Sequence, residues 1–288
     1  MTLAQKLELH LLLILTISSL TSLSNSATDT FVYGGCSQMK YAQGSPYEVG
    51  VDSLLTSLVN SAMYTTYNNF TIPGSSQQDT IYGLFQCRGD LSSNDCGRCV
   101  ARAVSQVGTL CLDSTGGALQ LEGCLVKYDK NAFLGVEDKT VVVKKCGPLI
   151  SSDSDAVLGR RDAVLGYLAT GDGTYKPYRV GGSGDVQAKA QCVQDLSFGE
   201  CQDCLSEAVG QLKTQCGNAR WGDMYLAKCY VRYSEGGDHS NGNQDHNNND
   251  DEIEKTLAIL IGLIAAVALI IIFVSFLSKA CEKGKGGK

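Results

Sequence analysis

Apolar residues form one long run near each end of the chain. Residues 11–15 (Leu-Leu-Leu-Ile-Leu) follow Lys6 and precede a stretch rich in serine and threonine, and residues 256–278 contain no charged residue. The first run, with small residues at Ser26 and Ala27, is typical of a secretory signal peptide that is cleaved after one of these two positions. The second run is long enough to cross roughly 30 Å of hydrocarbon as a helix. We therefore expect a signal peptide over residues 1–27 and a single membrane span over residues 256–278.

Charges on the two sides of the predicted span differ in sign. Acidic residues dominate the polar linker 236–255, whereas Lys279, Lys283, Lys285 and Lys288 follow the span. Because basic residues are retained on the cytoplasmic side, this asymmetry predicts a type I protein with its main region outside and residues 279–288 inside. A tail of ten residues is too short to fold into a catalytic domain.

Between the ends, one order of hydrophobic patterns occurs twice. Each copy has a short alternating segment, an amphipathic helix, a strand that ends at a cysteine, a second helix and then alternating strands. This order predicts an α+β module with an antiparallel sheet in each copy. The corresponding segments are 31–33 and 141–143, 51–62 and 156–168, the strands ending at Cys87 and Cys192, 95–109 and 200–214, and 119–128 and 224–233.

The cysteines repeat with the same period. Of 13 cysteines in the chain, 12 precede the predicted span, and ten of these form two sets with identical spacing that are displaced by 105 positions, as from Cys87 to Cys192. Cys36 and Cys146 complete two sets of six. This internal duplication predicts repeat one at 29–136 and repeat two at 138–235, with a boundary near Glu137. The ten matching cysteines are Cys87, Cys96, Cys99, Cys111 and Cys124, and Cys192, Cys201, Cys204, Cys216 and Cys229.

Composition excludes several functions. The net charge of −6 argues against binding to nucleic acid. The three histidines, His10, His239 and His246, lie outside both repeats, so a Cys–His or Ser–His–Asp site lacks its base. The two C-x-x-C pairs could be redox or zinc motifs. Structural disulfides are the favoured interpretation, because each pair belongs to a six-cysteine set in an oxidising compartment. We therefore expect no catalytic residue, metal or cofactor.

Four further segments suggest local chemistry or structure. Asn69-Phe70-Thr71 is an N-glycosylation sequon in a predicted loop after the first helix. Cys281, just inside the membrane, is a candidate for S-palmitoylation, the alternative being an unmodified thiol. Residues 181–184 (Gly-Gly-Ser-Gly) predict a hairpin turn rather than a phosphate loop. Small residues spaced by four in the span offer a face for helix packing, namely Ala258, Gly262 and Ala266.

Residues 82–90 (Tyr-Gly-Leu-Phe-Gln-Cys-Arg-Gly-Asp), followed by Cys96 and Cys99, resemble the plant ginkbilobin-type, or stress-antifungal, cysteine-rich repeat. Two such repeats, one span and a minute tail without a kinase resemble the plasmodesmata-located protein family. The resemblance implies two helices on an antiparallel sheet of about five strands in each repeat. It also implies residence at plasmodesmata, the membrane-lined channels between plant cells, where family members restrain or tune passage and are linked to callose deposition, defence and viral movement.

The same resemblance implies a disulfide order and a set of partners. The first cysteine of each repeat would pair with the fourth, the second with the third and the fifth with the sixth. Partners would include a second copy or related proteins, receptor-like kinases, viral movement proteins and cell-wall glycan. The implied pairs are Cys36–Cys111, Cys87–Cys96, Cys99–Cys124, Cys146–Cys216, Cys192–Cys201 and Cys204–Cys229.

The mannose site of the ginkbilobin-type repeat does not carry over. It uses an asparagine, an arginine and a glutamate, at positions that here hold Ser37, Ala118 and Asp129 in repeat one and Gly147, Asp223 and Ser234 in repeat two. Because the bidentate arginine donor is missing from both repeats, we expect weak or no mannose binding there. The leading hypothesis is a non-enzymatic interaction protein at plasmodesmata. The alternative is a carbohydrate-binding or co-receptor module at the general plasma membrane, and a redox enzyme comes third.

Overall fold

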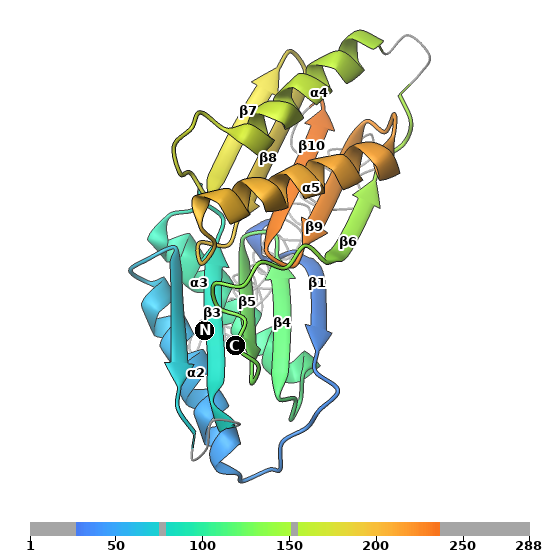
Figure 1. Ribbon diagram of the computed structural model, residues 1–288. Coiled ribbons are helices and arrows are strands. Elements are labelled where there is room, and N and C mark those ends of the chain that lie inside the picture. The colour runs from blue at the N-terminus through green and yellow to red at the C-terminus, as the bar shows by residue number, and fades with distance from the viewer. Residues whose placement is uncertain (1–26, 75–78, 151–154, 237–288) are drawn as a thin grey trace, which may run out of the picture. The chain divides into compact units, whose positions relative to one another are not determined.

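The computed structural model describes residues 27–74, 79–150 and 155–236. These residues form two α+β repeats (Figure 1), and each repeat has two helices on one face of a five-stranded antiparallel sheet. Most of the predicted signal peptide, the predicted span with Ala258, Gly262 and Ala266, and the tail with Cys281 lie outside the described residues. Within these residues, we find no helix with the length and apolar composition that a membrane crossing requires.

Repeat one contains five strands in the spatial order β1-β4-β5-β3-β2, so that β1 and β2 are its edge strands. All four pairings in this sheet are antiparallel. The elements in chain order are the 3-10 helix η1 (Ala27–Asp29), β1 (Phe31–Cys36), α2 (Pro46–Ala62), β2 (Tyr67–Ile72), β3 (Ile81–Cys87), α3 (Ser93–Leu110), β4 (Gly116–Leu121) and β5 (Cys124–Asp129).

Repeat two has the same topology, with the strand order β6-β9-β10-β8-β7. Its edge strands are β6 and β7. The elements in chain order are β6 (Val141–Cys146), α4 (Asp155–Thr170), β7 (Tyr178–Ser183), β8 (Val186–Cys192), α5 (Phe198–Cys216), β9 (Trp221–Leu226) and β10 (Cys229–Glu235).

The second helix of each repeat begins at a serine cap. The side chain of Ser92 accepts a hydrogen bond from the backbone N–H of Asp95 at the start of α3. Ser197 and Glu200 form a complete capping box at the start of α5. Both arrangements satisfy backbone donors that the first turn of a helix leaves without partners. Asp95 and Glu200, the acidic residues of these helix starts, lie in the first turn.

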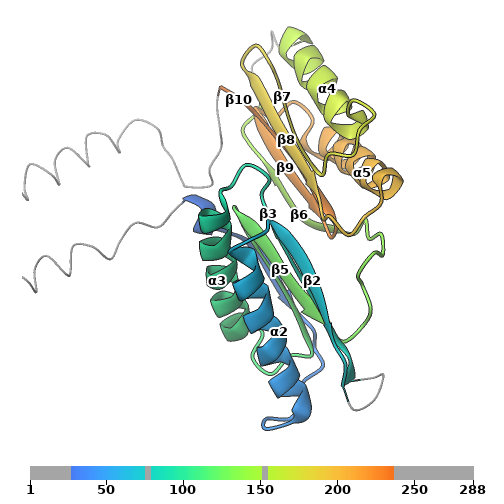
Figure 2. The same cartoon turned by 90° about the vertical axis from the view of Figure 1, so that its left-hand side faces the viewer.

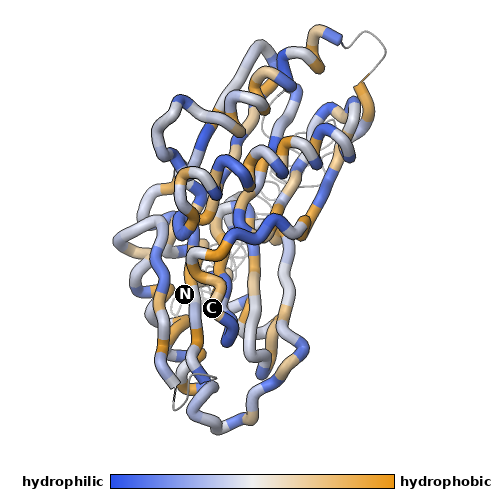
Figure 3. Tube along the Cα trace, viewed as in Figure 1, coloured by the Kyte–Doolittle hydropathy of each residue, from blue (hydrophilic) through white to orange (hydrophobic). Residues whose placement is uncertain are grey.

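The core of each repeat lies between the helices and the sheet. In repeat one, Leu54 and Leu58 of α2 and Val100 of α3 are fully buried against Phe85 of β3 and Val126 of β5. Repeat two buries the equivalent set from α4, α5 and its sheet. Figure 2 shows both helices of each repeat on one side of its sheet, and Figure 3 shows apolar residues alternating with polar ones along these elements. The predicted α+β fold of two helices on a five-stranded antiparallel sheet is confirmed.

The structure corrects two local expectations and adds two strands. The sequon around Asn69 lies in β2, an edge strand, and not in a loop. Gly181 and Gly182 belong to β7, and the turn of the β7–β8 hairpin falls at Gly184, which has a φ of 58°. The strands β2 and β7 are additions, because polar and glycine residues weaken the hydrophobic alternation by which a strand is recognised in a sequence.

Candidate functional site at the junction of the two repeats

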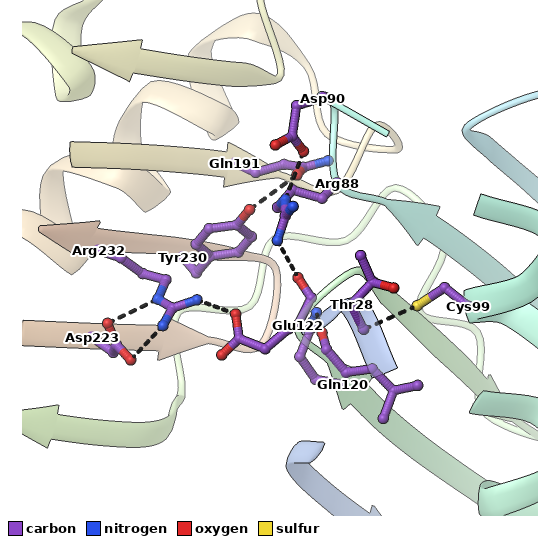
Figure 4. A network of polar contacts seen from close by, with 11 residues as sticks. Thr28, Arg88, Asp90, Cys99, Gln120, Glu122, Gln191, Asp223, Tyr230 and Arg232 are labelled. Carbon is purple, nitrogen blue, oxygen red and sulfur yellow. Dashed lines mark hydrogen bonds and ion pairs between the residues drawn. The ribbon is translucent and has the colours of Figure 1, made fainter. Parts of the chain in front are cut away.

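Arg232 of β10 binds two carboxylates, one from each repeat (Figure 4). Its Nε and Nη2 donate to the two oxygens of Asp223 on the neighbouring strand β9, at 2.8 and 3.0 Å. Its Nη1 donates to Oε2 of Glu122, which lies between β4 and β5 of repeat one. All three side chains are at most 5% exposed. The guanidinium therefore links two carboxylates, one from each repeat, and all three groups are shielded from water.

A second set of hydrogen bonds connects the ends of β3 and β8. The side-chain amide of Gln191 donates to the carbonyl of Cys87 at 2.8 Å, and the backbone N–H of Gln194 donates to Oε1 of Gln86 at 3.1 Å. The hydroxyl of Tyr230 donates to Oε1 of Gln191 at 3.2 Å. Gln86 and Gln191 are the equivalent residues of the two repeats, so the same position of each repeat contributes a hydrogen bond to the junction.

Arg88 extends this network within repeat one. Its Nη1 donates to the backbone carbonyl of Glu122 at 3.1 Å, and its Nε donates to Asp90 at 2.6 Å. Arg88 therefore fixes the backbone of the residue whose side chain reaches Arg232. The same turn packs against repeat two, because a Cβ added at Gly89 would lie 2.4 Å from Cβ of Tyr178.

Apolar side chains fill the junction beside these polar contacts. Leu84 and Leu125 of repeat one form a buried cluster with Val193 of repeat two. Next to this cluster, the rings of Tyr33 and Tyr225 meet edge to face with their centroids 6.1 Å apart. Burial of this apolar area stabilises the junction in addition to the polar contacts.

The segment between the repeats is anchored at Phe133. Lys228 donates to the carbonyl of Phe133 at 2.9 Å and also to Asp195, and the Lys228 and Asp195 side chains are 2% and 4% exposed. The ammonium groups of Lys127 and Lys228 lie 4.5 and 5.3 Å from the centroid of the Phe133 ring. One residue of the connecting segment is therefore held by lysines from both repeats.

Burial and neighbouring charges both shift the pKa values of side chains at the junction. Burial alone would lower the pKa of Arg232, but Tyr225, Asp223 and Glu122 raise it above its ordinary value, so the side chain stays charged. Burial raises the pKa of Tyr230 and of Tyr33. Burial and the neighbouring charge of Lys228 lower the pKa of Lys127. Arg232, Tyr230 and Tyr33 therefore keep their ordinary protonation states near neutral pH, because each of these shifts moves the pKa further above 7.

The positions of the mannose site lie in shallow grooves. Ser37, Ala118 and Asp129 line a groove of about 420 Å³ that also includes Val142 of repeat two. Asp223 and Ser234 line another of about 380 Å³ that also includes Asp90 of repeat one. The carboxylate of Asp223 is bound by Arg232, and a Cβ at Gly147 would collide with the Trp221 ring, at 2.3 Å. In repeat two, residues at these positions therefore serve the junction and local packing.

The structure places all twelve outer cysteines in disulfides that follow the order implied by the family resemblance. The cysteines of each C-x-x-C pair bond to different strands and not to each other, so that α3 and α5 are each fixed to their sheet. The disulfides are Cys36–Cys111, Cys87–Cys96, Cys99–Cys124, Cys146–Cys216, Cys192–Cys201 and Cys204–Cys229. In the part of the chain that the structure describes, no three histidine, cysteine or acidic side chains gather as metal ligands.

Sequence patterns did not reveal the junction itself. Glu122, Arg232 and Lys228 are polar residues that follow no periodic rule, and nothing in the sequence pairs Glu122 with a residue 110 positions away. The positions of the lost mannose site do contain one feature from which part of the junction could be predicted. Asp223 stands where the family has an arginine, and Arg232 follows nine positions later in the segment of predicted alternating strands, so a charge pair on adjacent strands could have been inferred.

Comparison with known proteins agrees with this architecture. The family model described as salt stress response/antifungal matches residues 35–131 and 152–236. Plasmodesmata-located protein 6 of Arabidopsis thaliana is 61% identical over 284 residues, which are 96% of this chain and 98% of the relative. Plasmodesmata-located protein 7 of the same plant is 59% identical over 270 residues, 93% of this chain and 89% of the relative.

Two solved structures have the same arrangement of repeats. The tandem DUF26 ectodomain of the Arabidopsis thaliana cysteine-rich receptor-like protein PDLP5 is 48% identical, with a TM-score of 0.68, and covers 72% of this chain and 100% of its own. The corresponding ectodomain of PDLP8 is 42% identical, with a TM-score of 0.69, and covers 73% and 100%. The fold and the disulfides thus define a tandem pair of salt stress response/antifungal repeats. The chain belongs to the plasmodesmata-located protein family.

Proposed function

We propose that the protein is a non-enzymatic, membrane-anchored interaction protein of plasmodesmata that tunes the passage of molecules between plant cells. The observation that carries this proposal is the similarity to a relative named plasmodesmata-located protein 6, which extends over 96% of the chain. Links to callose, defence signalling and viral movement belong to the same proposal.

Two features of the outer region favour binding over catalysis. All twelve of its cysteines are in disulfides, which leaves no thiolate for nucleophilic or redox chemistry. Residues 27–236 contain no histidine that could act as a general base near neutral pH. The buried junction fixes both repeats to each other, so a partner would meet their combined surface.

Imaging and transport measurements test the proposal together. A fluorescent fusion expressed from its native promoter should concentrate in puncta that coincide with a callose stain. The spread of a cytosolic fluorescent protein between cells should then differ between plants that lack the protein and plants that overproduce it. An even distribution over the cell surface, with unchanged spread in both lines, would contradict the proposal.

We propose that the predicted span, more than the tail, directs the protein to plasmodesmata. Replacing residues 256–278 by polyleucine of equal length should disperse the fusion, because mismatch between span and bilayer sorts proteins among membranes. Deleting residues 282–288 should leave the puncta, since lysines near the inner leaflet favour anionic lipid all over the cell. If the puncta survive the polyleucine replacement and vanish after the tail deletion, the localisation signal lies in the tail.

Self-association through the span is the partner proposal that the sequence supports most directly. The small residues Ala258, Gly262 and Ala266 allow two helices to approach closely. Gly262→Leu should reduce association of two differently tagged copies. Pairing that Gly262→Leu leaves unchanged would move the contact to the outer repeats. Further candidate partners are related proteins, receptor-like kinases and viral movement proteins. Each can be tested by co-purification with a tagged copy of this protein.

The alternative function is a wall-carbohydrate-binding or co-receptor module at the general plasma membrane. The grooves of about 420 and 380 Å³ favour it as a second candidate, because polar side chains such as Asp129 and Gln187 are among the residues that line them. The same imaging experiment separates the two functions, since a general wall receptor would be spread along the plasma membrane and not gathered at channels.

A further inference from the structure

Four strands lie at the edges of the two sheets, and three of them carry features that discourage pairing with another chain. In β1 and β6 the register shifts between Phe31 and Tyr33 and between Val141 and Val143. Beyond its shift, β6 carries Lys144 and Lys145. In β7, two consecutive glycines weaken the strand. Bulges, lysines and short or weak edges are the means by which native sheets avoid edge-to-edge association.

The fourth edge strand, β2, has none of these features. Its sequence Tyr-Asn-Asn-Phe-Thr-Ile contains no charged residue, proline or glycine. It pairs with β3 without interruption over all six residues, from Tyr67–Gln86 to Ile72–Ile81. Within the described residues, β2 is the last strand of its sheet. An uncharged, regular strand rich in aromatic and β-branched residues is a template for intermolecular pairing.

The N-glycosylation sequon lies on this same strand. Side chains alternate along β2: Phe70 and Ile72 pack against the core beneath the helices, whereas Asn69 pairs with Leu84, whose side chain lies in the cluster on the opposite face. Residues two apart in a strand point to the same side. The acceptor Asn69 and the hydroxyl residue Thr71 therefore share the face without helices, and both are exposed.

The two neighbouring asparagines of β2 differ in how they are held. Asn68 donates to the hydroxyl of Ser61 in α2 at 2.8 Å, and its Oδ1 accepts from the backbone N–H of Asn69. The side chain of Asn69 instead points outward, and its Nδ2 donates to the hydroxyl of Tyr67 on the same strand at 2.7 Å. A glycan on Asn69 would break one local contact and disturb no core packing. Six disulfides in the described repeats are in keeping with the secretory compartment where such glycans are added.

We propose that Asn69 carries an N-linked oligosaccharide and that this glycan shields the edge of β2 from pairing with another chain. A branched, hydrated glycan beside the edge blocks the approach of a second strand, as a charged side chain does elsewhere. The modification would supply β2 with the protection that bulges, lysines and glycines give to the other three edges.

The first test is the mass of the full chain purified from plant cells before and after endoglycosidase treatment. Wild type should lose the mass of one glycan, and Thr71→Ser, which keeps the sequon, should behave in the same way. Asn69→Gln and Thr71→Ala should show no change on treatment. An unmodified Asn69 peptide in the wild-type protein, or a glycan that persists in Asn69→Gln, would overturn the proposal.

The second test compares two variants that both lack the sequon. Asn69→Gln exposes a bare edge and should shift to larger assemblies than wild type in detergent chromatography of the full chain. Thr71→Lys also removes the glycan but places a charge on the edge, and should elute at the same assembly size as wild type. Equal behaviour of the two variants would show that the edge is not the surface involved.

A third measurement avoids any effect of the substitutions on folding. Wild-type protein with its high-mannose glycans is folded first and then trimmed enzymatically to a single sugar. Trimming should increase self-association relative to the untrimmed sample of the same preparation. Unchanged association after complete trimming would overturn the shielding role, even where the mass shift proves that Asn69 is modified.

Discussion

Arg232 of repeat two and Glu122 of repeat one form a buried ion pair across 110 positions of sequence, with side chains that are 5% and 3% exposed. The same guanidinium binds Asp223 through two nitrogens. A single cation therefore compensates two carboxylates that burial has removed from water. Loss of this cation would leave both acids uncompensated.

Arg232→Met should lower the free energy of unfolding of the outer region by about 3–5 kcal/mol, because removing one partner leaves buried charge behind. Chemical denaturation of residues 27–236 measures the change. Arg220→Met is the matched control. Its partner Glu235 is 3.9 Å away and the arginine side chain is 57% exposed, so the expected loss is below about 1 kcal/mol. Equal losses in both variants would contradict the role given to the junction.

Leu84→Ala should cost about 2–5 kcal/mol, as is usual for deletion of a buried leucine side chain. Leu84 is 1% exposed and contacts the cluster that includes Val193 of repeat two. Hydrogen exchange should therefore accelerate in repeat two around Val193 as well as in repeat one. Leu110→Ala, at a leucine that is 51% exposed, should change stability by less than about 0.5 kcal/mol. Faster exchange confined to repeat one would show that the repeats are not coupled there.

The disulfides of repeat one should contribute unequally to stability. Cys36–Cys111 spans a sequence separation of 75, against 9 for Cys87–Cys96. In the chain-entropy model these loops correspond to about 4.5 and about 2.7 kcal/mol. Replacing both cysteines of each pair by serine and measuring denaturation tests the ranking. Peptide mapping without reduction must first show the six pairs of the structure, and a disulfide between the repeats or free thiols at Cys96 and Cys99 would contradict them.

Alkaline pH should destabilise the fold through its buried tyrosines. Burial raises the pKa of Tyr128 to about 12, whereas an unfolded tyrosine titrates near 10. Between these values the folded state keeps a proton that the unfolded state has lost. The stability from this group is thus complete below pH 10 and is lost as pH rises toward 12, at about 1.4 kcal/mol per pH unit at most. Denaturation at a series of pH values should show a shallower decline for Tyr128→Phe.

The control for that series is Tyr64→Phe, because the side chain of Tyr64 is 88% exposed and its surroundings change little on unfolding. This variant should follow the wild-type curve. A decline that is the same in wild type, Tyr64→Phe and Tyr128→Phe would mean that Tyr128 is not responsible for the alkaline loss.

Mannose should bind the outer region very weakly or not at all. The groove around Ser37, Ala118 and Asp129 offers no arginine at the position of the bidentate donor, and an unpaired buried polar group costs about 1–3 kcal/mol. Calorimetry with wild type and with the triple variant Ser37→Asn, Ala118→Arg, Asp129→Glu measures this. Binding should appear in the triple variant alone. Micromolar affinity in wild type that Ser37→Ala abolishes would contradict the expectation.

The sequence predicts the repeats better than their junction because the two obey different rules. Periodic apolar residues such as Leu54 and Leu58 face a core on one side of a helix, and that pattern can be read locally. The contact between Arg232 and Glu122 depends on how two folded units meet, and no local period encodes it. The edge strand β2 was missed for a related reason, because Asn68 and Asn69 interrupt the expected alternation although Phe70 and Ile72 reach the core.

The sequence separations of the disulfides have a consequence for biosynthesis. The last cysteine of repeat one, Cys124, leaves the ribosome before the first cysteine of repeat two, Cys146. Repeat one can therefore begin to form its bonds before the thiols of repeat two have emerged. With identical cysteine spacing in both halves, the chance of exchanging partners between them is largest after release of a fully reduced chain. We expect the order of translation to suppress such scrambling, and refolding of the reduced, full-length outer region to produce it.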